Sequence, residues 1–428
     1  MKLERLKTNK LKKYAGIVLV FIAVIVTVVQ LTSRAKYRTT QSIKLAEGTI
    51  NYQIPDFNLM AVYLEKDGGY QIADNIPTNG YTLNKERTYC KVNENYNLPI
   101  TIEYNNGSIN IFNLTQKGTK CYLYFDVKQY TCKGIACEAI MANMNTWKTR
   151  SNFSTKVTDT TTGVIYKSLD ANQYDDNGEV YYFAGNPTDN WVKFAGFYWR
   201  IIRINGDGTI RMIYQGDSTN TTGTGTQITK SAFNSSYKDN MYVGYMYTSG
   251  QVHGNGTNST IKGVLDSWYS SNLSSYASKI ATGEGASFCN DRTPSSGSGI
   301  GATATDYAAY NRLYTNKAPT LKCTDTKDRF ATTIGLITAD EVNYAGAVFG
   351  TSNRSYYLYS ENYYWTMSPC YLDGVKKNAN VFGVNSDGSL GWATVGNDYG
   401  VRPVINLKAD TIFAEGGKGT SSNPYVVS

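Results

Sequence analysis

Paired tyrosines and one tryptophan near the end of the chain are the residues best suited to contacting a ligand. They are Tyr356, Tyr357, Tyr363, Tyr364 and Trp392. Tyrosine offers a large contact area with few rotors to immobilise, and its hydroxyl group makes directional hydrogen bonds. On an exposed loop face, these side chains would contact a glycan or a protein. The alternative is that one tyrosine of each pair is buried in the core.

Residues that support catalysis are scarce in this chain. His253 is the only histidine among 428 residues, so histidine-based metal sites and Ser-His or Cys-His catalysis have almost no donor to use. We expect His253 to lie on a loop without a fixed partner. Asp340, Glu341 and Asp373 are scattered acids, and a glycosidase needs two carboxylates at a separation that a sequence does not show. We therefore predict no catalytic residue, no metal site and no cofactor.

Two Asp-Gly segments, Asn205-Gly-Asp-Gly208 and Asn385-Ser-Asp-Gly388, carry oxygen atoms of the kind that calcium prefers. A calcium loop also needs a distal acid at a fixed spacing, which neither segment has. Each segment instead lies between two apolar runs, where Asp-Gly is a strong hairpin signal. We predict a β-hairpin turn at both places.

An uncharged apolar run over residues 14–31 indicates a membrane anchor. Its eighteen residues would span about 27 Å as a helix, which is close to the thickness of the bilayer core. The basic segment 1–13 before it predicts a cytoplasmic N-terminus and contact of the run with lipid. A cleaved signal peptide, cut near Ser33-Arg34-Ala35, is the alternative. Both interpretations export the remaining residues.

The charge distribution argues against a nucleic-acid partner. Residues 1–38 hold nine of the 42 basic residues and one of the 34 acidic residues, so the remaining 33 basic and 33 acidic residues cancel. A nucleic-acid-binding protein needs a basic face on its folded part. The formal net charge of +8 belongs to the flanks of the apolar run instead.

The cysteines predict a disulfide-bonded body, because disulfides are the default state on an exported chain. Pairing by position gives three bridges, which are Cys90–Cys121, Cys132–Cys137 and Cys289–Cys323. Sequence does not fix connectivity, so this pairing is a prediction. Zinc is the alternative for Cys132 and Cys137, but no second pair with ligand spacing follows. For the remaining Cys370, burial is favoured over a free thiol or an intermolecular link.

The pattern of strands and turns divides the exported part into three regions. Residues 35–128 alternate apolar and polar residues in short runs, which predicts a β-sandwich that acts as a spacer. Residues 129–176 are predicted to be a linker, with a short helix over residues 138–147 and a polar, Thr-rich stretch over residues 151–163. Residues 177–428 combine strands with a helical stripe over 261–280 and a second helix starting at the Thr338 capping box. The predicted fold class is mainly β, with an α+β C-terminal domain.

The order of segments within residues 177–428 resembles a known bacterial domain. The segments are Phe197-Tyr-Trp-Arg200, two helices with a cysteine pair between them, Trp365-Thr-Met-Ser-Pro369, residues 381–388 and Gly400-Val-Arg-Pro-Val404. They resemble a surface domain of unassigned function with a C-type-lectin-like fold, shared with formylglycine-generating enzymes and with the variable receptor-binding proteins of diversity-generating retroelements. The resemblance implies scaffold roles for Trp365, Ser368, Gly400, Arg402 and Pro403.

Compared residue by residue, the resemblance favours a binding protein over an enzyme. Formylglycine-generating enzymes bind copper through a cysteine pair near the chain end, where only Cys370 occurs here. The Glu-Pro-Asn, Gln-Pro-Asp and Trp-Asn-Asp motifs of calcium-dependent lectins are missing. We expect a membrane-anchored extracellular binding or adhesion protein of a Gram-positive-type bacterium that recognises a glycan or a protein. The alternatives are a structural subunit of a surface filament or wall complex, and an extracellular enzyme on a formylglycine-generating-enzyme-like fold.

Overall fold

The computed structural model describes most of the chain from residue 50 onward. The described ranges are 50–51, 58–77, 81–92, 101–105, 107–112, 117–127, 130–283 and 286–428. The predicted anchor, residues 14–31, and the basic segment 1–13 lie outside them. Within these ranges, no helix is both long enough and apolar enough to cross a membrane. The prediction of a mainly β fold is confirmed, with 35% strand and 15% helix.

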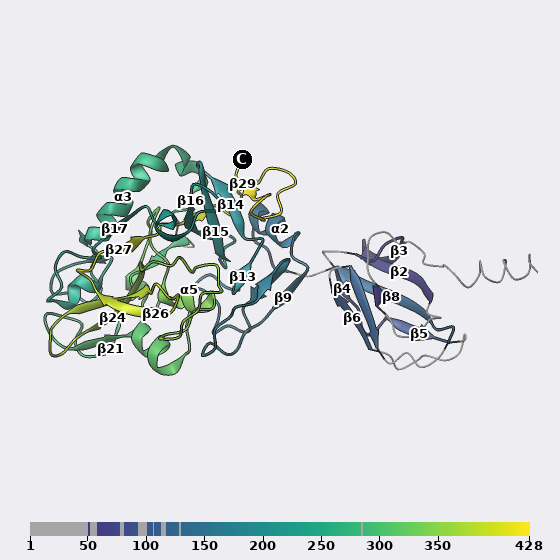
Figure 1. Ribbon diagram of the computed structural model, residues 1–428, viewed down its shortest axis with the longest axis horizontal. Helices are drawn as coiled ribbons and strands as arrows, with labels where there is room; N and C mark the ends of the chain where they lie inside the picture. Colours follow the sequence, from purple (N-terminus) through teal and green to yellow (C-terminus); the bar gives the residue numbers. More distant parts are fainter. Residues whose placement is uncertain are drawn as a thin grey trace, which may run out of the picture. The chain divides into compact units, whose positions relative to one another are not determined.

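The chain forms two compact units, an N-terminal one up to Pro77 together with Leu83–Asp126, and a C-terminal one over Val127–Ser428 together with Thr78–Thr82. The N-terminal unit has a sheet of order β3-β2-β8-β4, with β5 also paired to β8, and a second sheet of order β1-β7-β6 (Figure 1). The rings of Tyr104 and Phe125, one from each sheet, lie 4.9 Å apart, so the sheets are in contact. The strands are β1 (Ile50–Asn51), β2 (Asn58–Lys66), β3 (Gly69–Ala73), β4 (Tyr81–Leu83), β5 (Tyr89–Lys91), β6 (Thr101–Asn105), β7 (Ser108–Phe112) and β8 (Lys120–Val127).

Strand β8 shows how the alternating sequence divides the faces of the larger sheet. Cys121, Leu123 and Phe125 are buried, whereas Tyr122 and Tyr124 between them point to the other face. Cys121 lies directly opposite Cys90 of β5, and the two form the predicted disulfide. The other face carries a row of rings in mutual contact, from Tyr63, Tyr70, Tyr89, Tyr122 and Tyr124.

The interpretation of residues 129–176 as a linker is wrong, because this region is part of the C-terminal unit. It contains α2 (Ile135–Met141), β9 (Thr146–Lys148), β10 (Thr160–Thr161) and β11 (Val164–Lys167). The apolar side of α2, including Ile140 and Met141, is buried in the main core, and β11 pairs with both β9 and β12. The predicted disulfide Cys132–Cys137 is formed at the start of α2. A few well-placed apolar residues therefore outweigh the polar composition of the segment.

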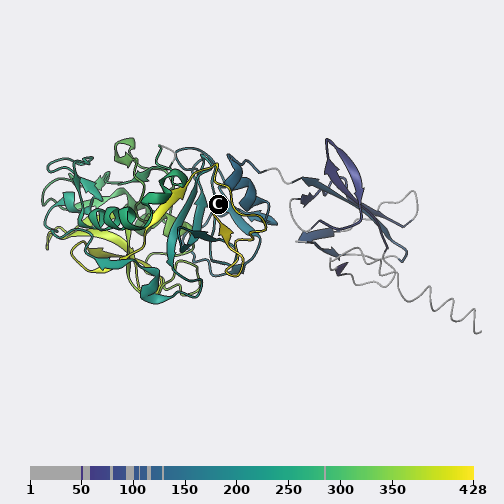
Figure 2. The ribbon, with the colours of Figure 1, turned by 90° about the horizontal axis from the view of Figure 1, so that it is seen from above.

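Two sheets organise the C-terminal unit. One has order β28-β16-β15-β12-β11-β9, with β14 paired to β15 and β29 paired to β14, which brings the C-terminus beside this sheet (Figure 1, Figure 2). The other has order β17-β27-β24-β22-β21, with β25 paired to β24 and β26 paired to β25. The longer strands are β14 (Trp191–Phe194), β15 (Phe197–Ile204), β16 (Ile210–Gly216), β24 (Tyr364–Leu372), β25 (Ala379–Val384), β26 (Leu390–Thr394) and β28 (Val404–Leu407).

Short strands complete these sheets and three smaller pairings. Those in the two large sheets are β12 (Tyr181–Tyr182), β17 (Thr229–Ser231), β21 (Pro294–Ser296), β22 (Thr305–Tyr307), β27 (Tyr399–Val401) and β29 (Tyr425–Val426). The smaller pairs are β10 with β13 (Asn186–Pro187), β18 (Met246–Tyr247) with β19 (Thr257–Asn258), and β20 (Phe288–Cys289) with β23 (Arg329–Phe330).

Both predicted hairpins are confirmed. Asn205-Gly-Asp-Gly208 connects β15 to β16, and Asn385-Ser-Asp-Gly388 connects β25 to β26. Gly208 has a φ of 90°, and a Cβ atom there would overlap the carbonyl oxygen of Lys133, so this turn requires glycine.

The helices are shorter than predicted. The stripe over 261–280 is split into α3 (Thr260–Asn272) and the 3₁₀ helix η3 (Ser274–Lys279), with Ser259 as the N-cap of α3. The Thr338 capping box is confirmed, but its helix α5 (Ala339–Tyr344) ends four residues before the predicted Val348. Further turns are α4 (Ala308–Tyr310), the π-helix η5 (Asn311–Asn316), and the 3₁₀ turns η1 (Gly223–Thr226), η2 (Asn240–Val243) and η6 (Thr326–Asp328).

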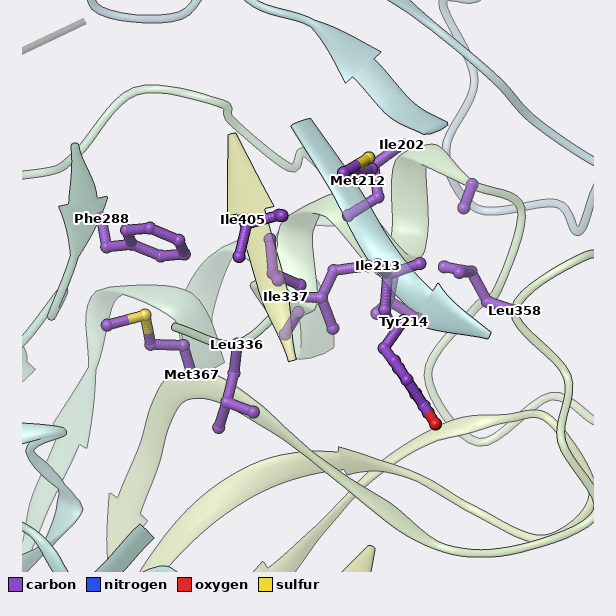
Figure 3. Packing of buried hydrophobic residues seen from close by; sticks show 14 of the residues in the cluster. Ile202, Met212, Ile213, Tyr214, Phe288, Leu336, Ile337, Leu358, Met367 and Ile405 are labelled. Carbon is purple, nitrogen blue, oxygen red and sulfur yellow. The ribbon is translucent and has the colours of Figure 1, made fainter. Parts of the chain in front are cut away.

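The main core lies in the C-terminal unit, where residues from β15, β16, β24 and β28 interdigitate (Figure 3). The predicted scaffold residues are all buried. Trp365 donates from Nε1 to the Ser231 carbonyl at 2.8 Å, and Ser368 Oγ accepts the Ala339 N–H at 2.9 Å. Arg402 donates to the carbonyl oxygens of Leu358 and Tyr214. A Cβ atom at Gly400 would overlap Gln227, and Pro403 follows Arg402 in the same buried segment.

Candidate functional site

The predicted ligand face of five aromatic residues is not formed as a single surface. Tyr356, Tyr357 and Tyr364 are buried in the core and make no exposed platform. The guanidinium group of Arg200 lies 5.2 Å from the Tyr357 ring, and that of Arg402 lies 4.9 Å from the Tyr364 ring. The rings of Tyr357 and Tyr364 pack against buried arginines, and all three tyrosines are inaccessible, so the interpretation of these three residues as ligand contacts is wrong.

Alternate burial, the other interpretation, describes one of the two tyrosine pairs. Tyr363 is 44% exposed, whereas Tyr364 next to it is fully buried. Tyr356 and Tyr357 are both buried. Tyr363 contacts the Tyr399 ring at 4.9 Å and belongs to a small cluster with Trp365, apart from the rings around Trp392.

Trp392 is half-buried and lies in a cluster of five rings, which we call the Trp392 patch: Tyr310, Tyr314, Phe349, Tyr371 and Trp392. The rings of Trp392 and Phe349 are stacked, with centroids 4.8 Å apart. Tyr371, Tyr310 and Tyr314 contact Trp392 at 5.3, 6.1 and 6.1 Å. Tyr314 is 44% exposed. The patch joins side chains from segments more than 80 residues apart in the sequence, which explains why the pattern of paired tyrosines did not reveal it.

A π-helix carries one edge of the Trp392 patch. η5 (Asn311–Asn316) holds Tyr314, and its C-cap Lys317 adopts a left-handed conformation with φ 52°. The Lys317 ammonium lies 5.6 Å from the Tyr314 ring centroid and 5.5 Å from that of Phe349. Partial burial lowers the pKa of Lys317. π-Helical turns are rare and often occur at functional sites.

A polar pocket, called the ionic pocket below, opens where β15, β16 and α5 meet the segment between Cys289 and Cys323. The predicted disulfide between these cysteines is formed and both residues line the pocket. The charged residues that line it are Asp175, Asp176, Arg203, Arg211, Asp291, Arg312, Lys322, Asp340 and Glu341. Sequence reasoning missed most of them. A signal was present, since Arg203 and Arg211 are charged residues in strands that are mostly apolar.

Buried ion pairs fix one wall of the ionic pocket. Glu341 Oε1 lies 3.0 Å from Arg203 Nε and 2.5 Å from Arg211 Nε, and Asp175 Oδ2 lies 2.9 Å from Arg203 Nη1. Burial alone would raise the pKa of Glu341, but Arg211 and Arg203 hold it below its ordinary value. The capping box of α5 adds a hydrogen bond from the Thr338 N–H to Glu341 Oε2.

A second ion-pair group lies on η5. Arg312 Nη2 is 2.6 Å from Asp291 Oδ2 and 2.8 Å from Asp340 Oδ2. Burial would lower the pKa of Arg312, but Asp340 and Asp291 together raise it above its ordinary value. Asp340 Oδ1 also accepts the Thr320 N–H at 3.0 Å, so both oxygens of this carboxylate have partners.

His253 has fixed partners, so the prediction of a free loop histidine is wrong. Its Nδ1 lies 3.1 Å from Asp328 Oδ2, and its Nε2 lies 3.7 Å from Asp325 Oδ2. Burial raises the pKa of Asp328 to about 6. The partners come from η6, more than 70 residues along the chain, which is a separation that no local pattern could reveal.

Cys370 has no disulfide partner and is fully buried, as predicted. Burial raises its thiol pKa well above the ordinary value, which keeps the reactive thiolate form scarce. Within the described ranges, no group of three or more His, Cys, Asp or Glu side chains is arranged to hold a metal ion.

We compared the chain with protein-family models, with characterised proteins and with solved structures, and none of these comparisons found a match. The functional argument therefore depends on the geometry described above.

Proposed function

We propose that this protein is a cell-surface binding protein and that the Trp392 patch of its C-terminal unit takes a glycan. The observation that carries the proposal is the patch itself, in which five rings gather at the surface around Trp392 and Tyr314. Sugar rings place C–H groups against the electron-rich faces of aromatic rings. The exposed Asn311, Thr315 and Asn316 of η5 supply hydrogen-bonding groups beside the rings for sugar hydroxyls.

The arrangement of the pocket carboxylates supports binding more than catalysis. Asp175, Asp340 and Glu341 each contact at least one arginine, and these pairs are buried. A general acid or base has to exchange its proton during the reaction, and strong ion pairing opposes this for a carboxylate.

The cellular setting is part of the same proposal. Three disulfides are typical of an oxidising compartment outside the cytoplasm. With residues 14–31 as the membrane anchor, the N-terminal unit would act as a spacer and the C-terminal unit as a head with a C-type-lectin-like scaffold. The buried Trp365, Ser368 and Arg402 suit that scaffold role.

The test is to offer the purified chain from residue 35 onward, oxidised so that its disulfides form, to a panel of bacterial and host glycans. We expect saturable binding of at least one glycan, and at least a tenfold loss of affinity in Trp392→Ala. Truncation of a large central aromatic contact typically removes 2 kcal/mol or more of binding energy.

The matched control is Tyr363→Ala, which removes a ring as exposed as that of Tyr314 from the separate cluster with Tyr399. Its affinity should stay within a factor of two of the unaltered chain. Equal losses in both variants, or binding confined to proteins in a parallel host-matrix panel, would refute glycan binding at the Trp392 patch. Turnover of an offered glycan would favour the enzyme interpretation instead.

A further inference from the structure

Asp291 is held in an unusual backbone conformation at the wall of the ionic pocket. Its φ of 46° lies in the left-handed region, which few residues other than glycine adopt and which aspartate tolerates better than most. The residues on both sides are fixed, because the Asn290 N–H donates to the Asp328 carbonyl at 2.8 Å and the Arg292 N–H donates to Asp328 Oδ2 at 2.6 Å. The fold therefore imposes this conformation.

Only one of the two carboxylate oxygens of Asp291 is used. Oδ2 contacts Arg312 Nη2 at 2.6 Å, whereas Oδ1 is buried and has no hydrogen-bond partner within the described ranges. The Asp291 side chain is 7% exposed. An unsatisfied buried acceptor costs about 1–3 kcal/mol, so such a group calls for an explanation. A donor that a ligand brings to this wall would remove the cost.

The charges of the ionic pocket do not cancel around Asp291. Arg312 brings one positive charge to two carboxylates, those of Asp291 and Asp340. The neighbouring group of Asp175, Arg203, Arg211 and Glu341 is balanced. Asp176, the remaining acid of the lining, pairs with Arg329 at 3.6 Å, so the uncompensated negative charge lies at Asp291 and Asp340. A cationic ligand would neutralise it.

We propose that the ionic pocket binds a ligand through a primary ammonium group that donates to Asp291. An ammonium group is a compact point charge with three donors, so it supplies both the missing hydrogen bond and the missing charge. A divalent metal ion would need several oxygen ligands in one place, and no such group is found in the described ranges. The inference is independent of glycan binding, because the pocket and the Trp392 patch share no residue.

The test is ligand-detected NMR on the full chain, with amines and matched neutral compounds as probes. The amines are ethanolamine and glucosamine, and their neutral counterparts are ethylene glycol and glucose. We expect saturable binding of at least one amine, at least tenfold tighter than binding of its counterpart. In Asp291→Asn, which removes the charge but tolerates the same backbone conformation, the affinity for that amine should fall at least tenfold.

Asp266→Asn is the control for the change in net charge, because Asp266 lies on α3 and pairs with Lys262. It should leave amine binding unchanged. Matching tryptophan fluorescence spectra and melting curves show whether Asp291→Asn is folded, and Asp291→Ser, which also removes the charge, serves as a second variant if it is not. Absence of amine binding, equal binding of the neutral compounds, or unaltered affinity in a folded Asp291 variant would overturn the proposal.

Discussion

The buried carboxylate of Glu341 allows a test of how the buried ion pairs of the ionic pocket stabilise the C-terminal unit. Glu341→Gln keeps the shape of the side chain, and its amide oxygen can still accept the Thr338 N–H of the capping box. The substitution removes the charge that faces Arg203 and Arg211. Arg203 keeps Asp175, but Glu341 is the only ion-pair partner of Arg211 in the described ranges. The substitution therefore removes the charge of residue 341 while the capping hydrogen bond is kept.

The size of the effect follows from the burial of these groups. The side chains of Arg211 and Glu341 are each 2% exposed, so solvent does not screen the cation left behind. Removing one partner of a buried ion pair typically costs about 3–5 kcal/mol. We expect the free energy of unfolding to fall by that amount in Glu341→Gln. Thr338→Ala, which removes the capping hydroxyl together with the γ-methyl group and leaves the Glu341 charge in place, should cost about 1 kcal/mol.

The assay is urea unfolding followed by tryptophan fluorescence. All six tryptophans lie in the C-terminal unit, so the signal reports this unit alone. Because the folded pKa of Glu341 lies below its ordinary value, its contribution is present above that value and is lost as the pH falls through the folded pKa. The difference between the unaltered chain and Glu341→Gln should therefore narrow in acid. If Glu341→Gln lowers the free energy of unfolding by less than about 1 kcal/mol at pH 7, or if the difference does not depend on pH, the buried ion pairs do not stabilise the unit in this way.

Two further predictions concern stability. Burial raises the pKa of Asp189 from 3.8 to about 6, so this group favours the folded state at low pH and loses that contribution as the pH rises through 6. Relative to the unaltered chain, Asp189→Asn should gain about 2 kcal/mol between pH 4 and pH 7, and a constant difference over this range would contradict it. Gly208→Ala should cost more than 2 kcal/mol, because the added Cβ overlaps the Lys133 carbonyl. Gly196→Ala has the same kind of φ, 84°, in open space and should cost only about 1 kcal/mol; equal losses in urea unfolding would refute the steric argument.

The sequence predicted those features that local chemistry decides. Asp-Gly turns marked both hairpins, and Thr338 with Glu341 marked the start of α5, because each signal acts within four residues. The three disulfides followed from pairing neighbouring cysteines, which succeeded because each bridge closes a loop of at most 34 residues. The failure at residues 129–176 came from composition, since a polar average hid the few apolar side chains that fix α2 in the core.

The candidate sites depended on long-range contacts that no pattern along the chain contains. Tyrosine pairs were chosen for their chemistry, but in the folded chain Tyr357 packs against Arg200 of β15, and Tyr364 packs against Arg402 between β27 and β28. Trp392 was identified, whereas its neighbour Phe349 was not, because their stacking exists only in the folded chain. Asp291 had no local feature in the sequence to distinguish it from the other acids of the chain.

The covalent loop closed by Cys289 and Cys323 holds parts of both proposed sites. Asp291 and Arg312 belong to the ionic pocket, and Tyr314 to the Trp392 patch, yet all three lie inside this one loop. The disulfide therefore holds together the two ends of a loop that contributes to both sites. Substitutions within this loop would change both proposed binding sites while the strands outside it stayed the same. Reduction of the Cys289–Cys323 disulfide would therefore affect the ionic pocket and the Trp392 patch together.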